Sequence, residues 1–391
     1  MAVELVTPGH SPPLDTLIAL GIASGVLQAH PTAEVLVEKE GASYRIVIGG
    51  QVEWDKVHDK LSEKMLFEME RLRYRTGDLY SAFGPQKGIE LRKLSETFKG
   101  IVELAREPML RITFEYSEGA QHAAREGRGR GRRGTYTAYL PIAPWAGKYF
   151  TGTYRYGEEP YTLCPLCAFL AWSGLLSSSS IITYVTKEKR GTIYVVPDPL
   201  SVKGYDLALL SLIFGEKRGR VRDDVPLLAA PLLALATGET LWPVEGDYGL
   251  YVWKYEGAGA FLGIRGYSQL PLRPLLEFAA EAKSRGRYLA RLIKRLDPSL
   301  VAQIAECLAY GEPDPYTVVR SVWSFLSQQK KRGRREGEVR KRGGNARTSR
   351  LLEKGFAEAL FGVWQRYWRG VTGAGGTPSS ATPVTGIGSW T

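Results

Sequence analysis

The sequence contains few of the residues from which disulfide-linked and metal-bound scaffolds are built. Its 391 residues include three cysteines, four histidines and four methionines. An odd and small number of cysteines excludes a disulfide framework and indicates a reducing, cytoplasmic location. Asparagine occurs once, at Asn345, and a scarcity of thermolabile residues in a charged chain is a tendency of thermophilic proteins.

Motifs for nucleotide and metal chemistry are also missing. The chain has no GxxxxGK(S/T) phosphate loop and no GxGxxG turn after a strand, which excludes the common nucleotide-binding motifs. Cys164 and Cys167 have metal-ligand spacing, but no second pair follows, and none of the histidines is close in sequence. Structural zinc needs four ligands, so we interpret the two cysteines as small buried residues of a helix. We expect no catalytic residue, metal or cofactor; metal or redox chemistry at this pair is the weaker alternative.

A metal-dependent nuclease is a further minor alternative. Pro197-Asp198 can begin a carboxylate–lysine nuclease site, with Glu281 and Lys283 as the later pair. Two metal-binding acids need a strand scaffold, and Glu281 lies in a segment with a helical pattern. The sequence therefore favours holding a polyanion over cleaving one.

No apolar run is suited to crossing a membrane. Residues 160–186 carry no charge, but Pro165, Gly174 and the serines at 177–180 interrupt them. A helix followed by a buried strand explains this run better than a membrane span. Glu4 and the lack of a basic N-terminal region argue against a signal peptide, and we expect no membrane partner.

Positive charge is what the sequence has in excess. The chain carries 52 Lys and Arg against 41 Asp and Glu, a net charge of +11, which favours an acidic partner and nucleic acid first. The densest part, the C-terminal basic segment, runs from Lys330 to Arg350 between two segments with helical patterns. We interpret it as a glycine-broken arm suited to phosphates, although a solvated loop is the usual meaning of a charge run taken alone. Its candidate contacts are Lys330, Lys331, Arg332, Arg334, Arg335, Arg340, Lys341 and Arg342.

A second basic segment is rich in arginine and glycine. Residues 110–116 alternate in polarity and predict a strand from Met109 to Tyr116, and Thr135 to Leu140 repeats the alternation. The arginines between them therefore lie on the loop of a predicted hairpin, and long loops of this composition are usually functional or disordered. The candidate contacts on this loop are Arg125, Arg128, Arg130, Arg132 and Arg133.

Aromatic residues crowd the chain after this loop. Eight lie between Tyr136 and Tyr161. Bases stack on aromatic faces beside a basic groove, but β-rich cores use the same residues, and packing in a sheet is the favoured interpretation. Further along, a helical pattern places Arg287, Arg291 and Lys294 on one basic face, which can follow a phosphate backbone or be solvated.

The overall pattern predicts an α+β fold. We expect a mixed α/β N-terminal domain with antiparallel hairpins (1–265), a basic helical C-terminal domain (266–369) and a disordered tail (370–391). Helices are expected at 15–29, 54–75, 89–106, 163–176, 206–214 and 226–236, and strands at 33–39, 43–48, 181–186, 192–196, 250–255 and 260–265.

Three features together resemble the large subunit of archaeal type I-A CRISPR surveillance (Cascade) complexes. These are the opening PLDTLIALGIASGV followed by a hairpin, LCPLCAFLAWSGL in mid-chain, and a mixed body followed by a basic helical part. The similarity spans residues 1 to about 369. In this resemblance the CxxC is a fragment of the paired-cysteine metal sites of some related large subunits.

The resemblance implies a non-catalytic role in antiviral defence. Such a subunit helps recognise the protospacer-adjacent motif on double-stranded target DNA, stabilises the displaced single strand, and positions the nuclease-helicase subunits beside the guide RNA complex. Base pairing reads the sequence while the protein reads a short motif and holds the DNA. Arg128 to Arg133 are the expected motif readers, because arginine is the usual reader of guanine. An RNA-binding or scaffolding ribonucleoprotein subunit is the alternative.

Overall fold

The computed structural model describes most of the chain, in twelve stretches. These are residues 2–75, 91–117, 122–125, 136–137, 161–215, 218–221, 224–237, 245–257, 263–284, 292–293, 295–335 and 345–368. The chain divides into two compact units, Met1–Asp224 with Val244–Tyr267, and Val225–Pro243 with Ser268–Thr391. The second unit therefore includes residues 225–243, which precede residues 244–267 of the first unit in the chain. The domain boundaries expected from the sequence stay a prediction.

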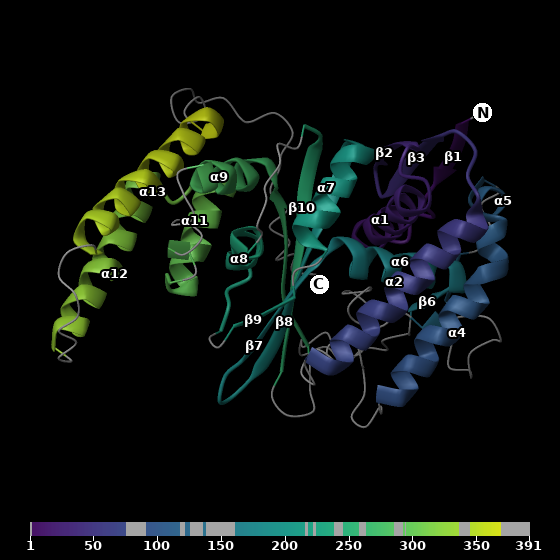
Figure 1. Ribbon diagram of the computed structural model, residues 1–391, viewed down its shortest axis with the longest axis horizontal. Helices are drawn as coiled ribbons and strands as arrows, with labels where there is room; N and C mark the ends of the chain where they lie inside the picture. The colour runs from purple at the N-terminus through teal and green to yellow at the C-terminus, as the bar shows by residue number, and fades with distance from the viewer. Residues whose placement is uncertain are drawn as a thin grey trace, which may run out of the picture. The chain divides into compact units, whose positions relative to one another are not determined.

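The mixed α+β class is confirmed, and the first unit is built on a large sheet (Figure 1). Its main path is β1-β3-β2-β8-β10-β11, with β7 and β9 paired beside β8. The pairs β1–β3, β2–β3, β2–β8, β8–β10 and β7–β8 are antiparallel, whereas β7 and β9 are parallel. The strands are β1 (Ala2–Val6), β2 (Glu34–Glu40), β3 (Ser43–Gly49), β7 (Ser180–Val185), β8 (Arg190–Lys203), β9 (Arg218–Val221), β10 (Asp247–Gly257) and β11 (Gly263–Pro271).

The local hairpins follow the sequence. Strands β2 and β3 pair from Val35↔Ile48 to Glu40↔Ser43, and Gly41 in the turn between them has a φ of 65°, which favours glycine. Strands β7 and β8 form the second expected hairpin. By contrast, β9 falls in a segment interpreted as a loop, because a short parallel edge strand has no local signal.

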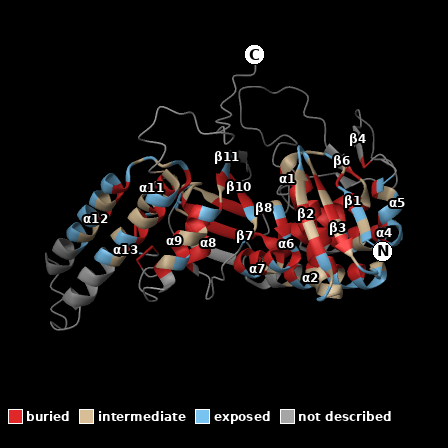
Figure 2. Cartoon of the chain, turned by 90° about the horizontal axis from the view of Figure 1, so that it is seen from above, coloured by how far each residue is buried: buried red, intermediate tan, exposed pale blue. Residues whose placement is uncertain are grey.

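Strand β8 holds the sheet together because its two halves pair different strands along one edge. Residues 190–195 pair β7 and residues 201–203 pair β2, while β10 follows the other edge. Pro197 and Pro199 fall in the interval between the β7 and β2 partners. Proline lacks an N–H donor and is tolerated where a ladder bond is not needed. Figure 2 shows how deeply these central strands are buried.

Two apolar helices cross very closely beside this sheet. Helix α1 (Pro12–Ala29) and helix α6 (Pro165–Ser178) are buried on almost every side. A Cβ on Gly174 would lie 2.0 Å from the Leu17 carbonyl oxygen, and one on Gly21 would lie 2.2 Å from that of Leu170. Glycine at both positions therefore allows the backbones to touch. Helix α2 (Trp54–Arg75) matches its expected bounds and packs against both.

The strand expected from Met109 to Tyr116 is wrong. Helix α4 (Leu91–Leu110) continues into this stretch, and helix α5 (Ile112–Ser117) completes it. Met109, Ile112 and Tyr116 are buried at helical spacing, whereas Phe114 is 57% exposed. A short polar–apolar alternation fits the two-residue repeat of a strand, but the same residues also fit one face of a helix. The packing of α4 against α2 and α6 stabilises the helix.

The hairpin expected around the Arg/Gly loop is also wrong. Strands β4 (Ala123–Arg125) and β5 (Tyr136–Thr137) both pair with β6 (Tyr161–Leu163), which lies between them. The loop thus connects two strands that are separated by a third. Residues 126–135 themselves lie outside the described residues, as do most of the clustered aromatics at 138–160.

Apart from the last residues of β11, the regular elements of the second unit are helices among its described residues. Helices α11, α12 and α13 pack on one another, and α8 packs on α9 and α11. Trp364 and Trp368 donate their indole N–H groups to the carbonyls of Gly311 and Leu308 at 2.9 and 3.1 Å, which fixes α13 to the end of α11. The helices, with α7 of the first unit, are α7 (Gly204–Phe214), α8 (Ala229–Thr237), α9 (Arg273–Ser284), α11 (Pro298–Tyr310), α12 (Pro315–Arg335) and α13 (Asn345–Trp368).

No membrane-spanning element is found in the described part of the chain. None of its helices combines the length and apolar character needed to cross a bilayer. The uncharged run at 160–186 instead gives β6, α6 and β7, as its internal breaks indicated.

Candidate nucleic-acid interface

Six of the sixteen arginines and lysines expected to contact nucleic acid lie in the described structure, all of them at the ends of elements. Arg125 closes β4, with its side chain undescribed, and Lys330, Lys331, Arg332, Arg334 and Arg335 lie in the last turns of α12. The others lie outside the described residues: Arg128, Arg130, Arg132, Arg133, Arg287, Arg291, Lys294, Arg340, Lys341 and Arg342.

The C-terminal basic segment is not wholly the glycine-broken arm that was expected. Helix α12 continues to Arg335 and α13 begins at Asn345, so both ends of the segment are helical. Lys, Arg and Gln are good helix formers, and Gly333 costs about 1 kcal/mol in a helix, which neighbouring turns tolerate. The first five basic residues are therefore carried by a helix.

One side of α12 carries exposed aromatic and basic side chains. Tyr316 is 72% exposed, Trp323 is 49% exposed, and Arg320 between them is exposed. Residues at spacings of three and four share a helix face, and the same spacing leads on to Ser327, Lys331 and Arg334. We name Tyr316, Arg320, Trp323, Ser327, Lys331 and Arg334 the α12 stripe.

Opposite the stripe, α12 is anchored to the rest of the unit. Val318 and Val322 are buried, as their spacing indicated, and Phe325 is half-buried. Asp314 caps the helix by accepting the backbone N–H groups of Tyr316 and Thr317 at 2.9 and 3.2 Å. The helix is therefore held by its buried face and its N-terminus, which leaves Tyr316, Arg320 and Trp323 on the outer side.

The charge of α12 is of one sign. Its 21 residues include Arg320 and the five basic residues of its last turns, with no acid among them. Tyr316 packs edge-on against Phe361 of α13, with ring centroids 5.0 Å apart. Sequence inspection missed Tyr316, Arg320 and Trp323, but an aromatic and basic face opposite Val318 and Val322 was a signal that could have found them.

Other lysines of the first unit are neutralised by acids. Lys189 and Lys254 each lie 2.7 Å from Asp224, and they lie 3.0 and 3.3 Å from Glu256. Burial raises the pKa of Asp224, but hydrogen bonds from both lysines outweigh it, and the net pKa is lowered. Two cations facing two carboxylates have no net charge to offer a phosphate backbone.

Asp198, considered above as a nuclease residue, is part of a buried network. Lys39 donates to one carboxylate oxygen at 2.7 Å and to the Tyr251 hydroxyl at 2.8 Å, and Tyr44 donates to the other carboxylate oxygen. Asp198 is fully buried. Glu281, its supposed partner, lies in helix α9 and pairs with Arg366. These contacts do not favour a metal-dependent nuclease centre at Asp198.

The cysteine pair has a neighbour that the sequence did not reveal. Cys164 caps the N-terminus of α6, Cys167 lies buried in its first turn, and His122 contacts both thiols. These three form a group of metal-ligand type among the described residues. His122 is more than forty residues upstream, and its approach depends on the pairing of β4 with β6.

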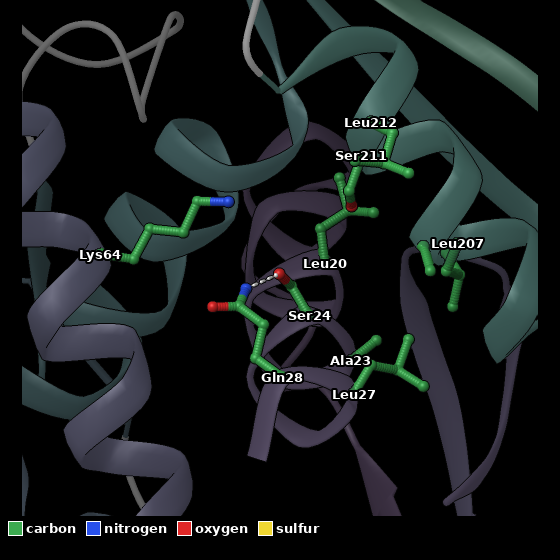
Figure 3. Close-up of a pocket in the computed structure, with 10 residues that line it drawn as sticks. Leu20, Ala23, Ser24, Leu27, Gln28, Lys64, Leu207, Ser211 and Leu212 are labelled. Carbon is green, nitrogen blue, oxygen red and sulfur yellow. Dashed lines mark hydrogen bonds between the residues drawn. The ribbon is translucent and has the colours of Figure 1, made fainter. Parts of the chain in front are cut away.

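An apolar pocket of about 250 Å³ opens beside helix α1 (Figure 3). Leu20, Leu27 and Leu212 line it, and Lys64 extends from α2 to its edge. Gln28 donates to Ser24 at 2.7 Å on its floor. With a mainly apolar lining, this pocket does not match the chemistry of a phosphate backbone.

Comparison with known proteins places the chain in a family. Residues 3–337 match the model of the CRISPR-associated protein family Cas_Csa4. A CRISPR system associated protein Cas8 from Thermoproteus tenax is 25% identical over 342 residues, which cover 83% of this chain and 93% of that protein. The family match includes α1, the cysteine pair, nearly all of the sheet and the whole of α12. It confirms the resemblance inferred from the sequence: the chain belongs to the Cas_Csa4 family of CRISPR-associated proteins.

Proposed function

We propose that this chain is a non-catalytic nucleic-acid-binding subunit of a type I-A CRISPR interference complex, and that the α12 stripe contacts the displaced single strand. The observation that carries the proposal is the α12 stripe itself. Exposed aromatic rings and cations at helical spacing combine base stacking with phosphate neutralisation, the two terms that govern binding to single strands.

The α12 stripe and the Arg/Gly segment have different roles in this proposal. The stripe holds backbone and bases without reading sequence, because lysines and half-exposed rings contact every nucleotide alike. Arg128 to Arg133 remain the proposed readers of the protospacer-adjacent motif on double-stranded DNA. The guide RNA complex and the nuclease-helicase subunits are the proposed protein partners, since base pairing and cleavage are delegated to them.

Fluorescence anisotropy with labelled single-stranded and duplex DNA tests the stripe. The Arg320→Ala, Lys331→Ala, Arg334→Ala variant should bind more weakly, with a shallower dependence of affinity on salt. Each lost phosphate contact lowers the slope of log K against log salt by about 0.9 on duplex DNA and about 0.7 on single strands. An unchanged affinity and slope would remove this face from the interface.

A matched control changes the same charge elsewhere. Lys56, Lys60 and Arg106 are exposed on helices α2 and α4 of the first unit, and replacing them by alanine also removes three positive charges. If both variants lost affinity by the same factor, a general effect of net charge would explain the loss. That result would count against a local interface.

The choice of nucleic acid separates the proposal from its alternative. A preference for single-stranded RNA over single-stranded and duplex DNA, in a protein that does not co-purify with guide RNA and other complex subunits, would favour the RNA-binding scaffold. Co-purification with guide RNA and the repeated backbone subunits supports the interference complex.

A further inference from the structure

The tertiary structure brings His122 against the thiols of Cys164 and Cys167. The His122 Nδ1 atom lies 3.4 Å from Cys164 Sγ and 3.5 Å from Cys167 Sγ, and all three atoms lie within 4.8 Å of one another. In a tetrahedral zinc site the metal lies about 2.3 Å from sulfur and about 2.0 Å from nitrogen, which puts N and S about 3.5 Å apart. The two nitrogen–sulfur distances already match this spacing.

The backbone around the thiols favours a negative charge. The Cys167 N–H points to Cys164 Sγ at 3.3 Å. Helix α6 begins at Pro165, directly after Cys164. A helix N-terminus stabilises a thiolate.

His122 is oriented as a ligand. Its Nε2 lies 3.1 Å from the carbonyl oxygen of Glu115. When Nε2–H donates to that carbonyl, the lone pair of Nδ1 points to the two sulfurs. Metal-ligating histidines almost always donate their other ring N–H in this way.

We propose that His122, Cys164 and Cys167 bind one zinc ion, with a water molecule in the fourth position. His122 immediately precedes β4 and Cys164 immediately follows β6, and these strands pair through Ala123↔Leu163. The ion therefore fixes the ends of both strands. Because β4 leads directly into the Arg/Gly segment, the site anchors the base of that segment.

Metal analysis of the full-length protein, purified with a reductant and without chelator, tests the site. One zinc ion per chain is expected. Chelated and reconstituted with Co²⁺, the reduced wild-type protein should show thiolate-to-cobalt charge transfer and the d–d absorption of tetrahedral cobalt. No metal in the purified protein and no cobalt spectrum would overturn the site, as would a Cys164–Cys167 disulfide in protein purified with the reductant.

Variants assign the ligands. Cys164→Ser and Cys167→Ser should each remove the metal, while Cys307→Ser should retain it, since Cys307 lies buried in α11 of the second unit. His122→Ala should weaken Co²⁺ binding at least tenfold and change the d–d bands, and an unchanged spectrum would overturn its assignment. The wild-type cobalt spectrum decides the proposal even where a cysteine variant does not fold.

Discussion

Lys39 and Asp198, 159 residues apart in the chain, form an ion pair within the main sheet, with Lys39 Nζ 2.7 Å from Asp198 Oδ2. Asp198 is fully buried and the Lys39 side chain is 15% exposed. The pair joins β2 to β8, the strand shared by both parts of the sheet. Lys39→Met should lower the free energy of unfolding by about 3–5 kcal/mol, because it leaves a buried carboxylate without its cation.

Denaturant unfolding followed by circular dichroism measures this loss. Lys39→Met combined with Asp198→Asn should recover part of it, because the double variant has no unpaired charge in the interior. Equal stability of Lys39→Met and wild type would show that Tyr44 and Tyr251 satisfy the carboxylate without the lysine.

The crossing of α1 and α6 predicts a strict requirement for glycine. Gly174→Ala places a methyl group 2.0 Å from the Leu17 carbonyl oxygen. Backbone cannot yield as a flexible side chain does, so the helices must separate, and the expected loss is about 3 kcal/mol. Thermal unfolding is the measurement.

Gly100→Ala is the matched control. Gly100 lies in helix α4, and a Cβ there meets no atom within 4 Å. Alanine is favoured over glycine in a helix by about 1 kcal/mol, so this variant should be slightly more stable than wild type. If both alanine variants behaved alike, the close approach of α1 and α6 would be refuted.

The Lys189–Asp224–Lys254–Glu256 cluster predicts a dependence of stability on acid pH. The pKa values of Asp224 and Glu256 are lowered because hydrogen bonds to their carboxylates outweigh the effect of burial. A lowered carboxyl pKa gives stability that is present above the unfolded pKa, about 4, and is lost as pH falls through the lower folded value. Unfolding followed between neutral pH and about pH 2 should show this loss.

The Lys254→Met variant measures how much this cluster contributes to the free energy of unfolding. It should lower the free energy of unfolding by about 2 kcal/mol at neutral pH, the range for a hydrogen bond to a charged group. The difference from wild type should shrink below about pH 4, as both carboxylates become protonated. A difference that stayed constant down to pH 2 would mean that lost packing, and not charge, caused it.

Trp323 provides a direct test of stacking on the α12 stripe. Trp323→Ala should lower the affinity for single-stranded DNA by about 1–3 kcal/mol. Because the ring is 49% exposed, the fold should change little. Tyr205→Ala is the control, since this aromatic is 70% exposed on α7, whose residues include no lysine or arginine. Equal losses in the two variants would argue against stacking at Trp323.

Local sequence patterns were sufficient for elements stabilised by their own neighbours. The β2–β3 hairpin and helix α2 follow from turn residues and periodicity. The same local view failed from Met109 to Tyr116, where eight residues satisfy a strand period and a helix face equally well.

Local sequence patterns likewise found only some of the residues of the candidate sites. Charge counting found the basic residues at the end of α12, because charge is a property of composition. It missed Trp323, whose exposure depends on which face α12 buries, and it missed His122, which is adjacent to Cys164 only because β4 pairs with β6.

The sequence by itself determined the excess of positive charge, the mixed α+β class and the family, since each is encoded in residue types and short spacings. Only the tertiary structure decided that Lys39 meets Asp198, that His122 completes the cysteine pair, and that aromatic and basic residues share one side of α12. Those contacts join residues far apart in the chain, or depend on which surface packing leaves open, and local preference carries no information about either.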